Sequence, residues 1–270
     1  MSEMKSAVGA GMDRSGDDLC VENSVREFKI WADVLNYGKK ILKNAGIVEA
    51  DLDAWYLFEQ IFGISRAQYF MCARENIAGS TAQKMAAQEQ TGNSLESKKA
   101  LDCVELWLKE KLSAYENTLE KRASRIPLQQ ILGQQEFMGL TFFVNEHVLI
   151  PRQDTETLVE EALKHLGDVE KPEILDMCTG SGCILLSLLL ERQDACGTGV
   201  DVSPEALEVA KKNAGILKVE NRADFVESDL FSAPYFCEKG GKDSGKYDIL
   251  ISNPPYIATE EIETLMEEVR

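Results

Sequence analysis

The stretch Glu173-Ile-Leu-Asp-Met-Cys-Thr-Gly-Ser-Gly-Cys183 joins an apolar run to a glycine-rich turn. The run predicts a short buried strand over Glu173–Cys178, and the turn leads directly into a predicted helix over Ile184–Glu191. Glycines let a backbone approach a ligand closely, and the N–H groups that open a helix point toward it. A glycine turn alone is a weak signal, because tight turns without a ligand are common.

Acidic residues end the next two predicted strands. Gly197–Asp201 places Asp201 roughly 20 residues after the glycine turn, where a carboxylate can accept both ribose hydroxyls of an adenosine-type ligand. Ala223–Asp229 is the following predicted strand, and it ends in a second acid, Asp229, which precedes Leu230. Both acids therefore stand where a strand gives way to a loop.

A fourth strand lies in Tyr247-Asp-Ile-Leu-Ile-Ser-Asn-Pro-Pro-Tyr256. The branched apolar run Ile249–Ile251 predicts a buried strand of a parallel sheet, and the two prolines end it because they cannot donate to a sheet ladder. Asn253 offers a carbonyl acceptor and an amide donor, and Tyr256 offers a flat aromatic face. This combination predicts a site that holds a planar group bearing an NH2.

The alternation of strands and helices predicts an α/β fold with a doubly wound sheet, which binds ligands at the C-terminal ends of its strands. Every group singled out above lies at such an end. A glycine turn, a spaced acid, a second acid and Asn-Pro-Pro-Tyr in that order therefore predict a ligand site rather than a purely structural pattern.

The chain ahead of this sheet has a different character. Residues 1–27 lack periodicity and predict a loose extension, whereas apolar residues at helical spacing predict a helical bundle over residues 28–124. Its tryptophans and phenylalanines are interpreted as core residues. Polar residues 78–97 predict a mobile insertion in it. The bundle carries no catalytic constellation, so we expect it to recognise a partner or to cover a site.

A linker over residues 125–153 separates the bundle from a cofactor-binding domain over residues 154–270. Within the linker, Gln135–Val144 and His147–Ile150 predict a pair of short strands that form a β-hairpin. The two acids of Asp154-Thr-Glu156 follow. They are either charges that favour a helix N-terminus or part of a substrate-side loop, and the sequence does not choose between these roles.

The composition limits the classes of function. A formal net charge of −17 argues against general binding to phosphate backbones, while 44% hydrophobic residues support packed cores. Seven cysteines without a CxxC pair indicate a reduced, cytoplasmic protein, and two histidines leave little material for a metal site, so no metal is expected. No apolar run approaches the membrane-spanning length of about 20 residues, so no membrane association is expected.

The motifs Asp176–Gly182, Asp201, Ser228-Asp229 and Asn253-Pro-Pro-Tyr256 together resemble Rossmann-like class I S-adenosylmethionine-dependent methyltransferases of the amino-methylating type. Further stretches resemble the HemK/PrmC family, the peptide chain release factor glutamine N5-methyltransferases. These stretches are Arg125-Ile-Pro-Leu-Gln129, Ile131-Leu-Gly133, Glu136-Phe137, Leu149-Ile-Pro-Arg152 and Asp154-Thr-Glu156. The resemblance covers about residues 30–270.

The resemblance implies S-adenosyl-L-methionine as the cofactor and class 1 peptide chain release factors as the partners. It assigns cofactor binding to Cys178, Thr179, Gly180, Ser181, Gly182, Asp201, Asp229, Leu230 and Asn253, with Asp201 at the ribose and Asp229 with Leu230 beside the adenine. It assigns the glutamine of a Gly-Gly-Gln motif to Asn253, Pro254, Pro255 and Tyr256. In this assignment Asn253 and the Pro254 carbonyl hold the carboxamide nitrogen, and Tyr256 packs on the flat amide.

Two local departures from the family pattern stand beside these motifs. Cys178 occupies a position where glycine is usual, and Gln153 replaces the usual proline after Arg152. Methyltransferases of this fold also continue through three further strands, so a chain that ends at Arg270 is expected to be a truncated member whose fourth strand is an exposed edge.

Two other functions remain open on the sequence alone. Asn-Pro-Pro-Tyr also suits an exocyclic base amine, so a DNA adenine N6-methyltransferase is one alternative, although the net charge of −17 argues against it. The other alternative is a non-catalytic fragment that binds a cofactor or a partner. A titration with cofactor separates this fragment from both enzymes.

Overall fold

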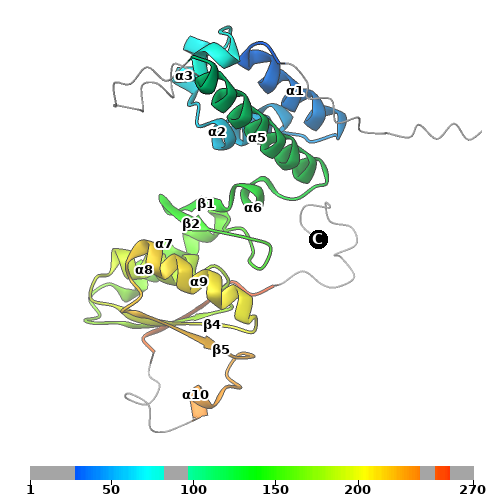
Figure 1. The fold of residues 1–270 in the computed structure, drawn as a ribbon. Coiled ribbons are helices and arrows are strands. Elements are labelled where there is room, and N and C mark those ends of the chain that lie inside the picture. The colour runs from blue at the N-terminus through cyan, green and yellow to red at the C-terminus, as the bar shows by residue number, and fades with distance from the viewer. Residues whose placement is uncertain (1–27, 82–96, 238–246, 256–270) are drawn as a thin grey trace, which may run out of the picture.

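The computed structural model describes residues 28–81, 97–237 and 247–255. The ribbon passes from a helical bundle through a small hairpin to a parallel sheet that carries helices on its faces (Figure 1). The predicted extension over residues 1–27 and most of the predicted insertion over residues 78–97 lie outside the described residues. Among the helices described, none is long and apolar enough to cross a membrane.

The bundle forms around aromatic side chains, as the apolar spacing predicts. Its helices are α1 (Trp31–Asn44), α2 (Ala50–Phe62), α3 (Arg66–Cys72) and α5 (Ser97–Ala123). Trp31, Phe58 and Tyr115 are among its largest fully buried side chains, and the rings of Trp31 and Phe58 meet edge to face at 5.9 Å. Interpreting the tryptophans and phenylalanines as core is therefore confirmed for Trp31 and Phe58 but is wrong for Phe70, which is 83% exposed.

The hairpin differs from the one predicted. A short helix, α6 (Leu128–Leu132), leads into β1 (Gln134–Phe137), which pairs antiparallel with β2 (Leu140–Phe143). Predicting one strand over Gln135–Val144 and its partner over His147–Ile150 is wrong, because the chain turns inside the first segment. Met138 and Gly139 both take a positive φ, 52° and 70°, which is the geometry of a tight hairpin turn.

The second half is a parallel sheet with the strand order β5-β4-β3-β6. The strands are β3 (Glu173–Met177), β4 (Cys196–Asp201), β5 (Ala223–Glu227) and β6 (Ile249–Ser252). Helices α7 (Glu156–Leu166), α8 (Cys183–Glu191) and α9 (Pro204–Leu217) gather on one face, and the short α10 (Pro234–Cys237) lies on the other (Figure 1). The Rossmann-like class I fold is thus confirmed in this part of the chain.

Strand order positions the site. The first strand of the sheet, β3, pairs with the last described strand, β6, so that Met177 lies opposite Ser252. The residues that follow these two, Cys178 and Asn253, therefore leave the sheet side by side. Sequence separation of the two motifs is large, but the parallel pairing brings them to one edge, which we call the carboxyl edge.

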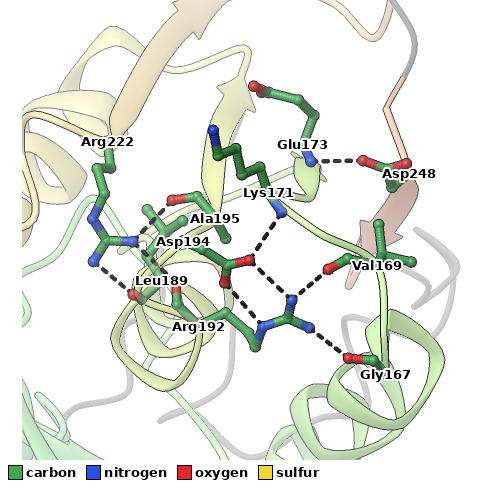
Figure 2. Close-up of polar contacts among 10 residues, drawn as sticks. All are labelled: Gly167, Val169, Lys171, Glu173, Leu189, Arg192, Asp194, Ala195, Arg222 and Asp248. Atoms are coloured by element: carbon green, nitrogen blue, oxygen red, sulfur yellow. Dashed lines mark hydrogen bonds and ion pairs between the residues drawn. The ribbon is translucent and has the colours of Figure 1, made fainter.

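The opposite edge, where the strands begin, is held by arginines (Figure 2). Arg222 donates to the carbonyls of Leu189, Arg192 and Ala195 at 2.6–3.1 Å, which ties the end of α8 to the start of β5. Arg192 in turn donates to the carbonyls of Gly167 and Val169, at the end of α7, and to the carboxylate of Asp194. At this amino edge, the guanidinium groups of Arg192 and Arg222 donate to backbone carbonyls and, for Arg192, to the Asp194 carboxylate.

Candidate active site

A recess opens at the carboxyl edge, with about 390 Å³ of empty space when open solvent is included. Its lining residues come from three segments of the chain. They are Leu149, Ile150, Pro151, Arg152 and Thr155, then Cys178, Thr179, Gly180, Ser181, Cys183 and Ile184, and finally Asn253. Of the sequence-predicted site residues, the recess therefore gathers Asn253 with most of the glycine turn.

The glycine turn is shaped by two glycines with different tasks. Gly180 has φ +53°, and a Cβ added there would meet no atom within 4 Å, so the backbone faces open space in the recess. Gly182 has φ +78°, and a Cβ there would come within 3.0 Å of Leu186 and 3.2 Å of Ala210. Gly180 thus leaves room for a ligand, whereas Gly182 permits close packing of α8 against α9.

Cys178 also takes the left-handed conformation, with φ +61°. This conformation explains why glycine is usual at the position, since a residue with a Cβ is strained there. Burial raises the pKa of the Cys178 thiol, and a hydrogen bond with Ser252 opposes that shift. The thiol is therefore a neutral part of the recess wall.

Asp201 supports the glycine turn directly. Its Oδ2 accepts from the backbone N–H of Gly180 at 2.9 Å, and its Oδ1 accepts from the backbone N–H of Ser203 at 3.1 Å. Each carboxylate oxygen keeps a further lone pair, since an ionised carboxylate has about four acceptor sites. The residue does not line the recess itself.

Asp229 and Leu230 lie beyond β5, beside the end of β4. The backbone N–H of Ser228 donates to the carbonyl of Asp201 at 3.0 Å, which places the two predicted acids on neighbouring strand ends. Asp229 is exposed, and Leu230 is 55% exposed with φ +51°. Neither residue lines the recess.

Asn253 is oriented by a side chain from the other wall. Its Nδ2 lies 3.4 Å from Thr155 Oγ1, at the long end of hydrogen-bond range, which leaves the amide oxygen for another partner. Pro254 and Pro255 follow with exposed rings. Tyr256 lies outside the described residues.

A buried carboxyl group lies directly beneath the turn. Asp176 is fully buried and accepts from Thr179 Oγ1 at 2.6 Å, while its Oδ1 has no hydrogen-bond partner among the described residues. Burial raises the pKa of Asp176 to about 7, although the hydrogen bond from Thr179 favours the ionised form. The group therefore titrates near neutral pH.

A further wall of the recess runs from Leu149 to Thr155. The sequence singled out Leu149–Arg152 through the family resemblance and left Asp154-Thr-Glu156 open as part of a substrate-side loop, but it did not predict how this segment packs. That segment packs through Val148 and Val144 against α9, a contact between residues far apart in the chain. The sequence left Glu156 as either a charge at a helix N-terminus or part of a substrate-side loop. In the structure its Oε1 accepts from the backbone N–H of Met138 at 2.8 Å, so it anchors the hairpin turn.

The parallel sheet, the glycine turn and the recess at its carboxyl edge define a methyltransferase-type α/β domain. Residues 153–269 match the methyltransferase small domain family, and residues 33–88 match the PrmC N-terminal domain family. A release factor glutamine methyltransferase of Caulobacter vibrioides is 34% identical over 232 residues, which are 86% of this chain and 67% of that relative. One of Deinococcus radiodurans is 31% identical over 238 residues, 88% of this chain and 71% of that relative.

The chain therefore belongs to the release factor glutamine methyltransferase family. It spans little more than half the length of other relatives that it matches. It covers 57% of the Fusobacterium nucleatum relative, to which it is 34% identical over 88% of its own length. It covers 56% of the Chlorobaculum tepidum relative, to which it is 44% identical over 61% of its own length.

Proposed function

We propose that the protein transfers a methyl group from S-adenosyl-L-methionine to the side-chain amide nitrogen of the glutamine in the Gly-Gly-Gln motif of class 1 release factors. The observation that carries the proposal is the shared recess, in which Asn253 lies beside the glycine turn. Membership of the family, whose relatives are named for this reaction, supports the same function.

The residues of the glycine turn fit the proposed cofactor. Open space beside Gly180 gives a ligand access to the backbone, and Asp201 fixes the turn by accepting the Gly180 N–H. When bound, the cofactor supplies a methyl group already activated on a sulfonium. Cys178, Thr179, Gly180, Ser181 and Gly182 would hold its amino-acid part. We place its nucleoside toward the strand ends that carry Asp201, Asp229 and Leu230.

Asn253 suits the acceptor side. Its Nδ2 faces Thr155, so its Oδ1 can accept an N–H from the carboxamide of the substrate. An amide nitrogen is a weak nucleophile, because its lone pair is delocalised into the carbonyl. Acceptors held beside that nitrogen orient it and stabilise the positive charge that develops during transfer, and the Pro254 carbonyl is assigned the same task.

The helical bundle is assigned to the recognition of the release factor, with domain limits at residues 28–124, 125–153 and 154–270. The match of residues 33–88 to the PrmC N-terminal domain family supports this assignment. Because release factors act during translation, the proposed reaction places the protein in the cytoplasm. Tyr256 is assigned to packing on the substrate amide.

The test is transfer of labelled methyl groups to a purified class 1 release factor by the 270-residue chain. A second release factor, in which the glutamine of the Gly-Gly-Gln motif is replaced by leucine, serves as the matched control. Labelling of the first but not the second supports the proposal. Equal labelling of both, or labelling of duplex DNA in their place, would overturn it.

A further inference from the structure

One polar side chain of the sheet domain has a task that the site residues above do not explain. Asn213 lies on α9 and is fully buried, although its helix neighbours on the same face are alanines and Val209. A buried amide without partners would destabilise the fold, so its contacts indicate what it is for. The hydrogen bonds of its side chain all reach residues outside α9.

Asn213 pairs with the free edge of the hairpin. Its Oδ1 accepts from the backbone N–H of Phe143 at 2.7 Å, and its Nδ2 donates to the carbonyl of Phe143 at 3.0 Å. The side chain thus satisfies both backbone groups of one residue, as a neighbouring strand would. β2 belongs to a two-stranded sheet, so this edge has no strand beside it among the described residues.

The same Nδ2 also reaches the glycine turn. It donates to the carbonyl of Ser181 at 2.9 Å, and Ser181 lines the recess. One amide therefore holds two segments that are far apart in the chain, the end of β2 and the turn between β3 and α8.

These two segments lead to two walls of the recess. Beyond Phe143 the chain packs Val144 and Val148 against α9 and then forms the wall Leu149–Arg152. The glycine turn forms another wall of the same recess. Because Asn213 bonds to the end of the strand that leads into one wall and to Ser181 in the other, it fixes how the two walls are set relative to each other.

We propose that Asn213 is a positioning residue of the methyl-transfer site. It sets the wall Leu149–Arg152 against the cofactor turn, so that the recess is already shaped when the cofactor enters. The inference rests on the proposed cofactor, but not on the identity of the methyl acceptor. Contact with the cofactor itself is not part of this role, since Asn213 acts through Ser181 and Phe143.

Asn213→Asp is the sharpest change, because it keeps the size and the acceptor for Phe143 N–H but replaces the donor by an oxygen. That oxygen faces two carbonyls, those of Phe143 and Ser181, and repels both. The matched control is Asn145→Asp, on the same exit from the hairpin. The Asn145 side chain only accepts, from the backbone N–H of His147 at 3.1 Å, so the aspartate keeps that bond.

The experiment measures two quantities on the full chain: the Kd for S-adenosyl-L-homocysteine by calorimetry, and hydrogen exchange of the Phe143 amide without ligand. We expect Asn213→Asp to raise the Kd about tenfold, because the bond to Ser181 in the cofactor turn is lost, and one buried hydrogen bond corresponds to about that factor. The Phe143 amide should exchange faster, because repulsion from the Phe143 carbonyl moves the remaining acceptor away from the Phe143 N–H. Asn145→Asp should leave both quantities within about twofold of wild type.

Asn213→Ala serves as the second variant should the aspartate prevent folding, because it removes all three side-chain hydrogen bonds without introducing a charge. Faster exchange at Phe143 with an unchanged Kd would overturn the proposal, since Asn213 would then support only the hairpin. Failure of the wild-type chain to bind S-adenosyl-L-homocysteine would overturn it as well. Binding without methylation of a release factor would contradict the proposed substrate and leave the role of Asn213 standing.

Discussion

The two edges of the sheet carry polar side chains for opposite purposes. At the amino edge, Arg192 and Arg222 spend their donors on backbone carbonyls and on Asp194, so little hydrogen-bonding capacity remains (Figure 2). At the carboxyl edge, Asn253 keeps an amide oxygen free of the Thr155 contact, and Gly180 faces open space. Polar groups that are satisfied within the chain stabilise the fold, whereas those with spare capacity beside a recess indicate a binding site.

The largest effect is expected at the carboxyl edge, from Asn253→Ala. Removing the acceptor that we propose for the substrate amide should lower kcat about 100-fold to 1,000-fold, by analogy with the loss of one transition-state hydrogen bond. The free energy of unfolding should change little, because the side chain of Asn253 makes only the long contact with Thr155 among the described residues. Initial rates of methyl transfer give kcat, and urea denaturation gives the free energy of unfolding. A normal kcat would contradict the role proposed for Asn253.

The amino edge should respond in the reverse way. Arg222→Met removes bonds to three backbone carbonyls and should lower the free energy of unfolding by about 2–3 kcal/mol. At a temperature where the variant is folded, its Kd for S-adenosyl-L-homocysteine should equal that of the wild type. Arg222→Lys is the control, since one ammonium can keep part of this pattern and should cost less. A raised Kd in the folded Arg222→Met protein would contradict the claim that the amino edge affects stability but not ligand binding.

The pH dependence of the free energy of unfolding should have opposite signs for a carboxyl group at each edge. The pKa of Asp176 is raised to about 7 by burial, so the folded state binds this proton more tightly than the unfolded state does. Its stabilising contribution is complete below pH 4 and is lost as the pH rises through about 7. Asp176→Asn should therefore show a smaller fall in the free energy of unfolding between pH 5 and pH 7.5, measured by urea denaturation.

Asp194 at the amino edge provides the opposite case. The hydrogen bond from Arg192 lowers the pKa of Asp194, so its contribution is present above the unfolded pKa and disappears as the medium becomes more acidic. Asp194→Asn should not change how the free energy of unfolding varies between pH 5 and pH 7.5. It should change that dependence only at more acidic pH. Parallel curves for wild type and Asp176→Asn would show that the Asp176 carboxyl is not what titrates.

The smallest effect concerns backbone strain, which occurs at both edges. Cys178 at the carboxyl edge and Lys218 at the end of α9 both have φ +61°. Replacing either by glycine should raise the free energy of unfolding by up to about 1 kcal/mol, because glycine adopts this conformation without a Cβ penalty. Only Cys178→Gly should also change the Kd for S-adenosyl-L-homocysteine, since Cys178 lines the recess and Lys218 does not. Equal effects on ligand binding would contradict the comparison.

The sequence predicted the features that depend on strand order, but not those that depend on contacts between distant segments. The strands and the meeting of the glycine turn with Asn253 were predictable, because parallel strands bring their carboxyl ends to one edge. The packing that places the wall Leu149–Arg152 and the role of Asn213 were not, since they depend on contacts between the hairpin and α9 that no local pattern encodes. The one available signal was a polar residue on an otherwise apolar face of α9.

The hairpin turn was missed for a local reason. Met138 takes φ +52°, a conformation for which methionine has no preference, so the sequence reads as one continuous strand. A hydrogen bond from its backbone N–H to Glu156 holds the turn in place. The functional roles of Asp201, Asp229, Leu230 and Tyr256 stay predictions.

Two anchors, Glu156 on Met138 and Asn213 on Phe143, have a consequence for dissecting the chain. The hairpin precedes the sheet domain in sequence, but these hydrogen bonds fix it to the helices of that domain. An expression fragment of the sheet domain alone should therefore begin before Gln134. A fragment that begins at residue 154 would strip Asn213 of two of its bonds and leave a buried amide facing solvent. Where the chain is cut thus decides whether the isolated domain keeps a formed recess.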